Sequence, residues 1–398
     1  MHTLSKYPSS LTVLSLFSGC GGLDLGFVNA GFQLKLSIDH WEPAVATHKL
    51  NSKLLGGEVI RKSLRLGDGE IQVDELPVCD VILGGPPCQG FSFAGKQRLN
   101  DPRNALYQDF MNIVNHLQPK CFVMENVRGI EAMALPDVVH SFDSVGYDVS
   151  AERVQATHFA VPQRRARVII VGFRKDLCIR FSPPRQALGG LFGSSHEISI
   201  FEAIGDLPEP SATTSEGVID IKPGDLLCNH VYKPLSAQAQ LFVRHIPNGG
   251  CFRDAPEQFL PERLRKILRN PARYRSPRLF PKPDPFSPAQ TVPADMNPSL
   301  GGVLAPDFIY VDGKPRAVTP AECEKDGLYT APDPSRRFTP REAARLQTFP
   351  DKFVIKGSVS TQIRLIGNAV PVNLAYAYAQ QIRELLSVSK KSRRVAIG

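Results

Sequence analysis

The sequence has no hydrophobic run long enough to cross a membrane as a helix, which takes about 20 apolar residues. Residues 1–11 also lack the basic start and the apolar stretch of a signal peptide. The 398 residues are 42% hydrophobic and 22% charged, which is typical of a globular protein with room for two domains. We therefore expect a cytoplasmic protein with no membrane partner.

Paired cysteine motifs are also missing. No two of the eight cysteines stand in a CxxC arrangement, so neither a zinc site nor a disulfide framework is indicated. We expect no bound metal and reduced thiols, one of which could be catalytic. Internal repeats are absent as well.

Acidic residues are outnumbered, 39 against 47 basic ones, giving a net charge of +8. Residues 244–278 alone hold nine Arg or Lys and three Asp or Glu. A basic surface favours a polyanionic partner such as nucleic acid. A solvated Arg-rich helix around 261–269 is the alternative interpretation of this stretch.

The N-terminal part has the pattern of a nucleotide-binding βαβ unit. An apolar strand (11–17) is followed by a glycine turn (18–22), a helix (23–30) and a second strand (33–38) that ends at Asp39. Glycines allow close backbone approach to a ligand, and an acidic residue there suits a ribose diol. The turn alone is weak evidence for a cofactor, and Asp39 could equally cap the next helix.

Two reactive side chains follow later strands of the same expected sheet. Cys88 is displayed on a Gly-Gly-Pro-Pro loop after the strand 80–83, and Glu125 follows the apolar strand 120–124. Ligands of open α/β sheets bind at this carboxyl edge. A lone cysteine is more often structural, and a lone glutamate is often a cap or an ion-pair partner. Their shared position favours a catalytic site.

The rest of the chain divides into segments that differ in periodicity and composition. Gln163, Arg165 and Arg167 alternate on an extended segment and are expected to project to one side, toward phosphates, a base edge or solvent. Periodicity then fades from 176 to 330, and eight prolines lie within 271–298. A helix signature returns at 339–347, where Thr339 caps and Glu342 completes the capping box. A helix at 372–387 and a basic tail follow.

Six of these stretches, in this order, resemble the DNA (cytosine-5)-methyltransferases, most closely the bacterial restriction-modification type. They are LFSGCGG (16–22), GGPPCQGFS (84–92), MENVRG (124–129), PQRRAR (162–167), RRFTPREAARLQTFP (336–350) and IGNAVP (366–371). The resemblance implies an α/β fold, a doubly wound Rossmann-like sheet with a second, smaller, loop-rich target-recognition domain. The expected domains are a catalytic and cofactor-binding domain (1–175), a target-recognition domain (176–330), a segment returning to the catalytic domain (331–389) and a basic tail (390–398).

The resemblance also implies the site residues. Cys88 would be the nucleophile, Glu125 the partner of the cytosine edge and Arg165 its companion. The cofactor, S-adenosylmethionine, would be held by Phe17, Ser18, Gly19, Cys20, Gly21, Gly22, Asp39, His40, Pro86, Leu106, Asn368, Ala369 and Val370. The DNA contacts would come from Gln89, Ser92, Gln163, Arg167 and Thr291. One departure is Ser63, near the place where the family often has an Asp that faces the adenine amine.

The implied reaction is methylation of carbon 5 of a flipped-out cytosine in a specific duplex DNA site. We expect a monomer on double-stranded DNA, nucleoid-associated through it, with any cognate restriction endonuclease acting separately. A tRNA substrate is the alternative, but that branch is short where this chain has 155 residues (176–330). Amino-methylating enzymes carry an aromatic residue after Pro-Pro, where this chain has Cys88. A dinucleotide oxidoreductase is another alternative, but it would explain only the first glycine turn and none of the later motifs. A non-catalytic DNA-binding protein on this fold is expected to lack the nucleophile or the carboxylate, whereas this chain has both Cys88 and Glu125.

Overall fold

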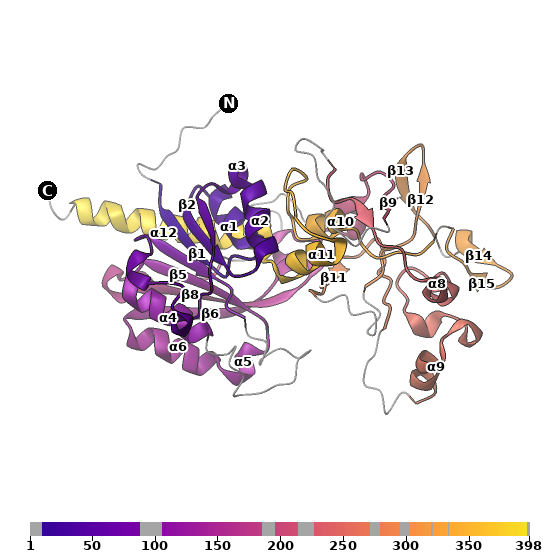
Figure 1. Cartoon of the computed structure of the whole chain (residues 1–398), viewed down its shortest axis with the longest axis horizontal. Helices are drawn as coiled ribbons and strands as arrows, with labels where there is room; N and C mark the ends of the chain where they lie inside the picture. The colour runs from indigo at the N-terminus through magenta and orange to yellow at the C-terminus, as the bar shows by residue number, and fades with distance from the viewer. Residues whose placement is uncertain are drawn as a thin grey trace. The chain divides into compact units, whose positions relative to one another are not determined.

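The computed structural model describes residues 10–87, 106–184, 196–213, 227–270, 279–294, 303–319, 321–332 and 334–395. The chain forms two compact units (Figure 1). The first comprises residues 1–160, 166–193 and 369–398, and the second comprises 161–165 and 194–368. No helix within the described ranges is long and apolar enough to cross a membrane.

The first unit is built on a seven-stranded sheet with the order β3-β2-β1-β4-β5-β8-β6. The five strands from β3 to β5 are parallel, and β8 runs antiparallel to both of its neighbours. The elements are β1 (Thr12–Leu16), α1 (Gly22–Asn29), β2 (Gln33–Asp39), α2 (Glu42–Leu50), α3 (Ser52–Leu55), β3 (Glu58–Arg61), β4 (Val81–Gly84), α4 (Leu106–Leu117), β5 (Cys121–Asn126), α5 (Ile130–Met133), α6 (Leu135–Ser144), β6 (Tyr147–Gln155), β8 (Ala166–Arg174) and α12 (Val372–Val395). The α/β prediction is confirmed.

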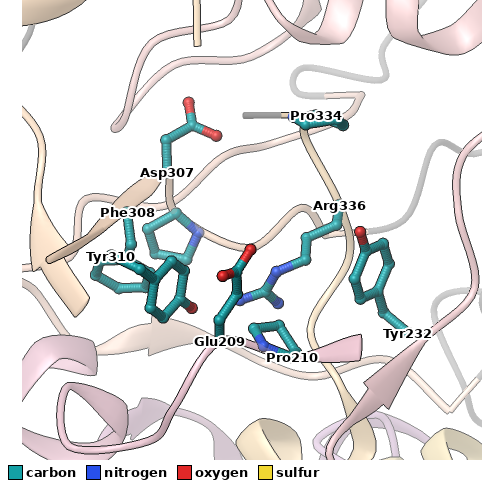
Figure 2. Close-up of a pocket in the computed structure, with 9 residues that line it drawn as sticks. Glu209, Pro210, Tyr232, Asp307, Phe308, Tyr310, Pro334 and Arg336 are labelled. Atoms are coloured by element: carbon teal, nitrogen blue, oxygen red, sulfur yellow. The ribbon is translucent and has the colours of Figure 1, made fainter. Parts of the chain in front are cut away.

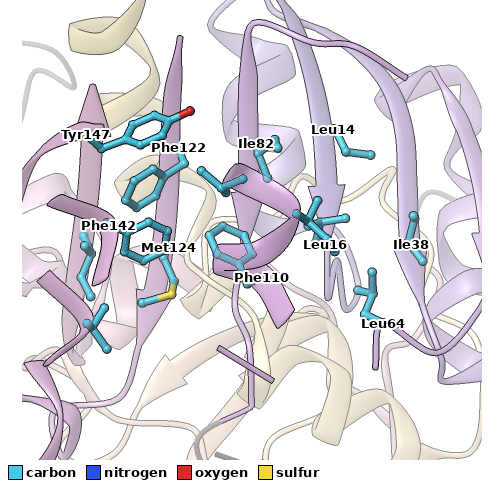
Figure 3. Close-up of a cluster of buried hydrophobic side chains, with 14 of the residues drawn as sticks. Leu14, Leu16, Ile38, Leu64, Ile82, Phe110, Phe122, Met124, Phe142 and Tyr147 are labelled. Carbon is cyan, nitrogen blue, oxygen red and sulfur yellow. The ribbon is translucent and has the colours of Figure 1, made fainter. Parts of the chain in front are cut away.

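Burial explains why these strands form. Every residue of β4 and β5 is buried, as expected for parallel strands covered on both faces. On one face, alternate residues of the strands pack with α4 and α6, where Phe122 stacks on Phe142 with ring centroids 4.0 Å apart (Figure 3). On the other face, Phe173 of β8 contacts Phe181, which in turn contacts Tyr378 of α12.

The C-terminal helix α12 returns to the start of the chain and packs on α1. The two helices are so close that a Cβ added to Gly26 would lie 2.3 Å from the Cβ of Ala375 and 2.7 Å from the backbone nitrogen of Tyr376. The side chain of Asn373 also donates to the carbonyl of Ala160 at 3.3 Å. The fold therefore needs glycine at position 26 because nothing larger fits.

The second unit consists of short elements joined by long irregular segments, in agreement with the loop-rich texture of its sequence. They are β7 (Gln163–Arg164), α7 (Ile200–Ile204), β9 (Ser211–Ala212), β10 (Val231–Tyr232), α8 (Ala237–Val243), α9 (Glu262–Arg269), β11 (Ala289–Gln290), β12 (Phe308–Val311), β13 (Lys314–Ala317), β14 (Glu324–Lys325), β15 (Leu328–Tyr329), α10 (Pro340–Leu346) and α11 (Val359–Asn368). A small core that includes Phe242, Phe252 and Leu304 holds part of it together. The capping box predicted at Thr339 and Glu342 is confirmed.

The return to the first unit begins later than the expected boundary at 331. Residues 331–368, with α10 and α11, belong to the second unit, and only 369–398 belong to the first. The reason is local bonding, since the buried Arg341 donates to the carbonyls of Cys228 and Phe353 at 3.0 and 2.7 Å. These bonds tie α10 to other segments of the second unit.

Replacing Gly26 by Ala tests the packing of α1 against α12. Alanine normally stabilises a helix interior, but here its methyl group would meet backbone atoms that cannot move cheaply. We expect the free energy of unfolding in urea to fall by about 1–3 kcal/mol. Gly67→Ala is the matched control, because nothing lies within 4 Å of its added Cβ. Equal stability of the two variants would contradict the close packing.

Candidate functional site

Four expected site segments end at one edge of the sheet. Since β1, β2, β4 and β5 are parallel and β1 pairs with both β2 and β4, their carboxyl ends lie on the same side. Phe17, Asp39, Gly85 and Glu125 stand at or just after these ends. Irregular backbone beyond parallel strands is where such sheets bind ligands.

The glycine turn after β1 has an unusual backbone. Phe17, Gly19 and Gly21 all have positive φ, at 54°, 55° and 86°. A left-handed Phe is strained, and strain of this kind is concentrated at ligand sites. The hydroxyl oxygen of Ser18 is buried and has no hydrogen-bond partner among the described residues. A buried polar atom without a partner in such a turn fits a site for a polar ligand group.

Asp39 ties the turn to the end of β2. Its Oδ2 accepts from the backbone N–H of Gly19 and its Oδ1 from that of Trp41, both at 2.8 Å. A carboxylate oxygen has more than one lone pair, so both oxygens keep capacity for hydroxyl donors such as a ribose diol. His40, next to it, is exposed and could lie against a flat ring. These groups fit an adenosyl ligand, with the turn and the first turn of α1 nearest its charged end.

Glu125, the second-last residue of β5, carries a nearly buried carboxylate. Its side chain is 10% exposed, and its Oε1 lies 2.8 Å from Nε of Arg167, whose side chain is 13% exposed. Burial lowers the pKa of Arg167, and the neighbouring Glu125 opposes that shift. The other oxygen, Oε2, would lie 3.5 Å from a Cβ added at Gly85. The carboxylate therefore sits over the Gly-Gly-Pro-Pro loop with its charge matched.

The structure places several further residues that the sequence assigned to this site, and three lie outside the described residues. Pro86 is buried beyond β4, Leu106 begins α4, and Ala369 and Val370 are buried just before α12. Cys20 and Gly22 are buried around the start of α1. Cys88, Gln89 and Ser92 fall on residues that the structure does not describe.

Four expected residues belong to the second unit. Gln163 is fully buried, its amide donating to Leu346 O at 3.5 Å and accepting from Val292 N at 3.4 Å. Arg165 is buried and donates to Gly367 O at 2.9 Å. Thr291 donates to Arg164 O at 2.9 Å, and Asn368 is exposed at the end of α11. Gln163, Arg165 and Arg167 thus do not share one open face as expected, since the first two are buried in the second unit and the third pairs with Glu125.

Asn126 is a site residue that the sequence argument passed over. Its side-chain amide donates to Pro86 O at 3.2 Å, and its oxygen accepts from Val127 N at 2.8 Å. It therefore joins the ends of β4 and β5, which carry the cysteine loop and Glu125. The available signal was its place directly after Glu125 in MENVRG, where a polar residue in a buried strand needs a partner.

A second missed feature is a buried polar cluster beneath the glycine turn. Asp24 of α1 is fully buried and accepts from Ser15 of β1 at 2.5 Å and from Ser37 of β2 at 3.1 Å. His48 Nε2 lies 3.6 Å from Asp24 and would be 2.9 Å from a Cβ at Gly21. The cluster joins α1, β1, β2 and α2 directly behind the turn, so it fixes the turn's position.

A family model described as C-5 cytosine-specific DNA methylase matches residues 11–223 and 287–384. The chain belongs to this family. It is a DNA cytosine-5 methyltransferase, which confirms the resemblance drawn from the six motifs.

Two curated relatives match the enzyme over most of its length. Type II methyltransferase M.FnuDI of Fusobacterium nucleatum is 32% identical over 391 residues, covering 96% of this chain and 97% of that protein. Type II methyltransferase M.NgoPII of Neisseria gonorrhoeae is 32% identical over 389 residues, covering 94% and 96%. Among solved structures, a prophage-encoded protein (E. coli) titled as a proposed DNA modification methyltransferase superimposes with a TM-score of 0.63 at 25% identity, covering 95% of this chain and 99% of that one.

The Asp24 cluster generates a prediction about pH. Burial raises the pKa of Asp24 to about 6, against the opposing hydrogen bonds of Ser15 and Ser37, and lowers the pKa of His48 to about 4. Asp24 binds its proton more tightly in the folded state, so its contribution to stability falls as pH rises from about 4 to 6. His48 binds its proton more tightly in the unfolded state, so its contribution rises between about pH 4 and 6.5.

In the wild type these two contributions largely cancel, and single variants should separate them. With Asp24→Asn the free energy of unfolding should rise with pH across this window, and with His48→Gln it should fall, each by on the order of 3 kcal/mol. Urea titrations at pH 4, 5, 6 and 7 measure both slopes. Variants with parallel slopes would show that these groups do not titrate as their burial requires.

Proposed function

We propose that this enzyme transfers a methyl group from S-adenosylmethionine to carbon 5 of a cytosine flipped out of duplex DNA, through a covalent bond between Cys88 and carbon 6. The observation that carries the proposal is Glu125, a nearly buried carboxylate held by Arg167 beside Gly85, three residues before Cys88. Family membership supports the reaction class, and the geometry supports the roles of these residues.

The proposed first step raises the electron density at carbon 5, which is a weak nucleophile in cytosine. The Cys88 thiolate adds to carbon 6, the electrons of the 5,6 double bond move into the ring, and negative charge develops toward N3. Glu125 would supply or share a proton at N3 and accept from the exocyclic amine. Because Oε1 is bonded to Arg167, Oε2, the oxygen nearer Gly85, is the one left for the base. Stabilisation of developing charge by such fixed groups is a large term in catalysis.

The remaining bonds follow from that intermediate. Carbon 5 would form its new bond to the methyl carbon as that carbon's bond to sulfur breaks and the sulfur keeps the electron pair. A water would then take the proton from carbon 5, and the electrons of that C–H bond would restore the 5,6 double bond and expel the Cys88 thiolate. When bound, S-adenosylmethionine supplies an electrophilic methyl carbon on a positively charged sulfur. In this chain Asp39 would hold its ribose, Ser18 and the glycine turn its charged end, and His40 its ring.

Other residues would orient the base and the DNA. Arg165 is proposed to donate on the O2 side of the cytosine, and Gln89 and Ser92 to contact the DNA from the loop after Cys88. The buried Gln163 would act by holding the β7 segment to its neighbours. Thr291 remains our candidate for a base-proximal position. Flipping a base costs a few kcal/mol, which these contacts would offset.

The second unit is proposed to recognise the target sequence, and the enzyme to act as a monomer that protects DNA in a restriction-modification system. Two observations support this. The relatives that match it over nearly their full lengths are named type II methyltransferases. The surplus of basic residues in 244–278 would supply phosphate contacts. Any cognate endonuclease would be a separate protein.

Duplex DNA containing 5-fluorocytosine tests the covalent step, with the methyl donor radiolabelled. Fluorine at carbon 5 blocks the final proton removal, so the enzyme should stay attached to the DNA and appear as a labelled, shifted band on a denaturing gel. Cys88→Ser should bind DNA but give no band, and its turnover on normal DNA should fall by more than about a thousandfold. A band in the variant, or wild-type-like turnover, would refute the role of Cys88, and a band only with tRNA would move the substrate to RNA.

The pair of Glu125 and Arg167 gives a second test. Glu125→Gln should lower kcat by about a hundredfold or more while DNA binding is retained, because the amide cannot protonate N3. Arg167→Gln should lower kcat less than Glu125→Gln does, since it keeps the Glu125 carboxylate but removes the guanidinium that binds it. Arg153→Gln is the control, because it removes a guanidinium from a more exposed pair, with Glu131, in the same unit. A kcat of Glu125→Gln equal to that of the control would exclude the proposed proton transfer.

A further inference from the structure

The second unit contains a pocket that the proposed reaction does not use. Four segments far apart in sequence form it: Glu209–Pro210, Tyr232 of β10, Pro306–Tyr310, which enters β12, and Pro334–Arg336. The cavity measures about 510 Å³ including its open mouth. Because this volume includes open solvent, the pocket is an open site at the surface rather than an enclosed cavity.

Aromatic rings stand around a fixed guanidinium in this pocket. Figure 2 shows Tyr232 and Tyr310 on opposite sides of Arg336, with Phe308 behind Tyr310. The guanidinium carbon of Arg336 lies 5.7 Å from the centre of the Tyr232 ring, and its nitrogens bind both oxygens of Glu342 at 2.7 Å. Glu342 is itself held in the capping box of α10. The flat groups are therefore held in place before any ligand arrives.

Some polar groups of the pocket already have hydrogen-bond partners within the protein, and one does not. Asp307 accepts from the buried Lys282 at 2.6 Å and from the Tyr329 hydroxyl at 2.6 Å, so it lines the pocket without offering a free acceptor to a ligand. Arg336 is committed to Glu342, and to the Tyr310 hydroxyl as well. Glu209 is exposed at the mouth and has no hydrogen bond or ion pair to any described residue. Its carboxylate is thus the acceptor available to a ligand.

These features select the ligand's chemistry. The tyrosine rings and the Arg336 guanidinium between them present flat surfaces that favour a flat aromatic ligand, and a carboxylate acceptor requires N–H donors on the ligand's edge. A phosphate would be repelled by Glu209 and Asp307, and an alkylammonium would meet the cationic Arg336. Extrahelical bases are bound in this way, by stacking between side chains and by hydrogen bonds to their Watson–Crick edge.

We propose that this pocket binds an unstacked nucleobase at its mouth, against the flat surface formed by Tyr232, Tyr310 and the Arg336 guanidinium between them, with Glu209 reading its N–H edge. Guanine should bind best because N1–H and N2–H present two parallel donors to one carboxylate. Cytosine and adenine offer one amino group each, and thymine flanks its single N–H with two carbonyl oxygens that repel Glu209. The base could come from a free nucleotide or from an unpaired position in DNA.

Binding measurements on the full chain without methyl donor test the pocket. In the first arm, isothermal titration with dGMP, dCMP, dAMP and dTMP should give dGMP the lowest Kd and dTMP the highest. Glu209→Gln and Tyr232→Leu should each weaken dGMP binding by roughly tenfold or more, the effect of a lost base contact or stack. Glu324→Gln is the matched control, an exposed carboxylate of the same unit on β14, outside the pocket. Glu209→Gln changes an exposed side chain, so loss of folding is not expected to obscure it.

A second arm identifies the source of the base. A duplex with one unpaired guanine is compared with the same duplex fully paired. If the preference for the unpaired guanine disappears in Glu209→Gln, the ligand is a base of DNA; if only dGMP binding falls, it is a free nucleotide.

The proposal is overturned if no nucleotide binds, if dTMP binds as well as dGMP, if deoxyribose 5-phosphate binds as well as dGMP, or if Glu324→Gln weakens dGMP binding as much as Glu209→Gln does. These experiments measure nucleotide binding and not methyl transfer. A negative result would therefore not count against the reaction tested with 5-fluorocytosine, and a negative trapping result would not count against nucleotide binding in the pocket.

Discussion

The parallel direction of four neighbouring strands is the constraint on which the site depends. A parallel sheet is covered on both faces, so its central strands, here β4 and β5, are buried throughout and polar side chains collect at or beyond their ends. In this enzyme β1, β2, β4 and β5 deliver the glycine turn, Asp39, the Gly-Gly-Pro-Pro loop and Glu125 to one edge.

Each charge placed at that edge is matched, because burying an unmatched charge is costly. Glu125 is held by Arg167, and Asp39 by two backbone N–H groups. Asp24, behind the turn, differs: burial raises its pKa to about 6 and so disfavours its charged form, although Ser15 and Ser37 donate to it. Near the glycine turn, Ser18 Oγ and His48 Nε2 are buried polar atoms without a hydrogen-bond partner among the described residues. Ser18 lies where a polar end of the methyl donor is proposed to bind.

The second unit is held by a different principle. Its strands are two to four residues long, and their pairings are too short to organise the unit alone. Buried cations joined to several segments take that role: Lys282 binds Asp307, Ser335 and the carbonyl of Val243, and Arg341 binds three carbonyls. Such groups must be fully bonded, so each one fixes the path of several loops. The aromatic pocket is a consequence, since its walls are those same loops.

The amino-acid sequence by itself determined the sheet, the glycine turn, the capped helix α10 and the family, because apolar periodicity, turn residues and motif order are local properties. It could also assign Glu125 to the carboxyl edge, since a charged residue ending a buried strand has few other places to go. Only the tertiary structure decided that Arg167 holds Glu125, that Gln163 and Arg165 are buried in the other unit, and that the chain returns at Ala369. The partner of a long side chain depends on which distant segments pack beside it, and alternation along a strand carries no information about that.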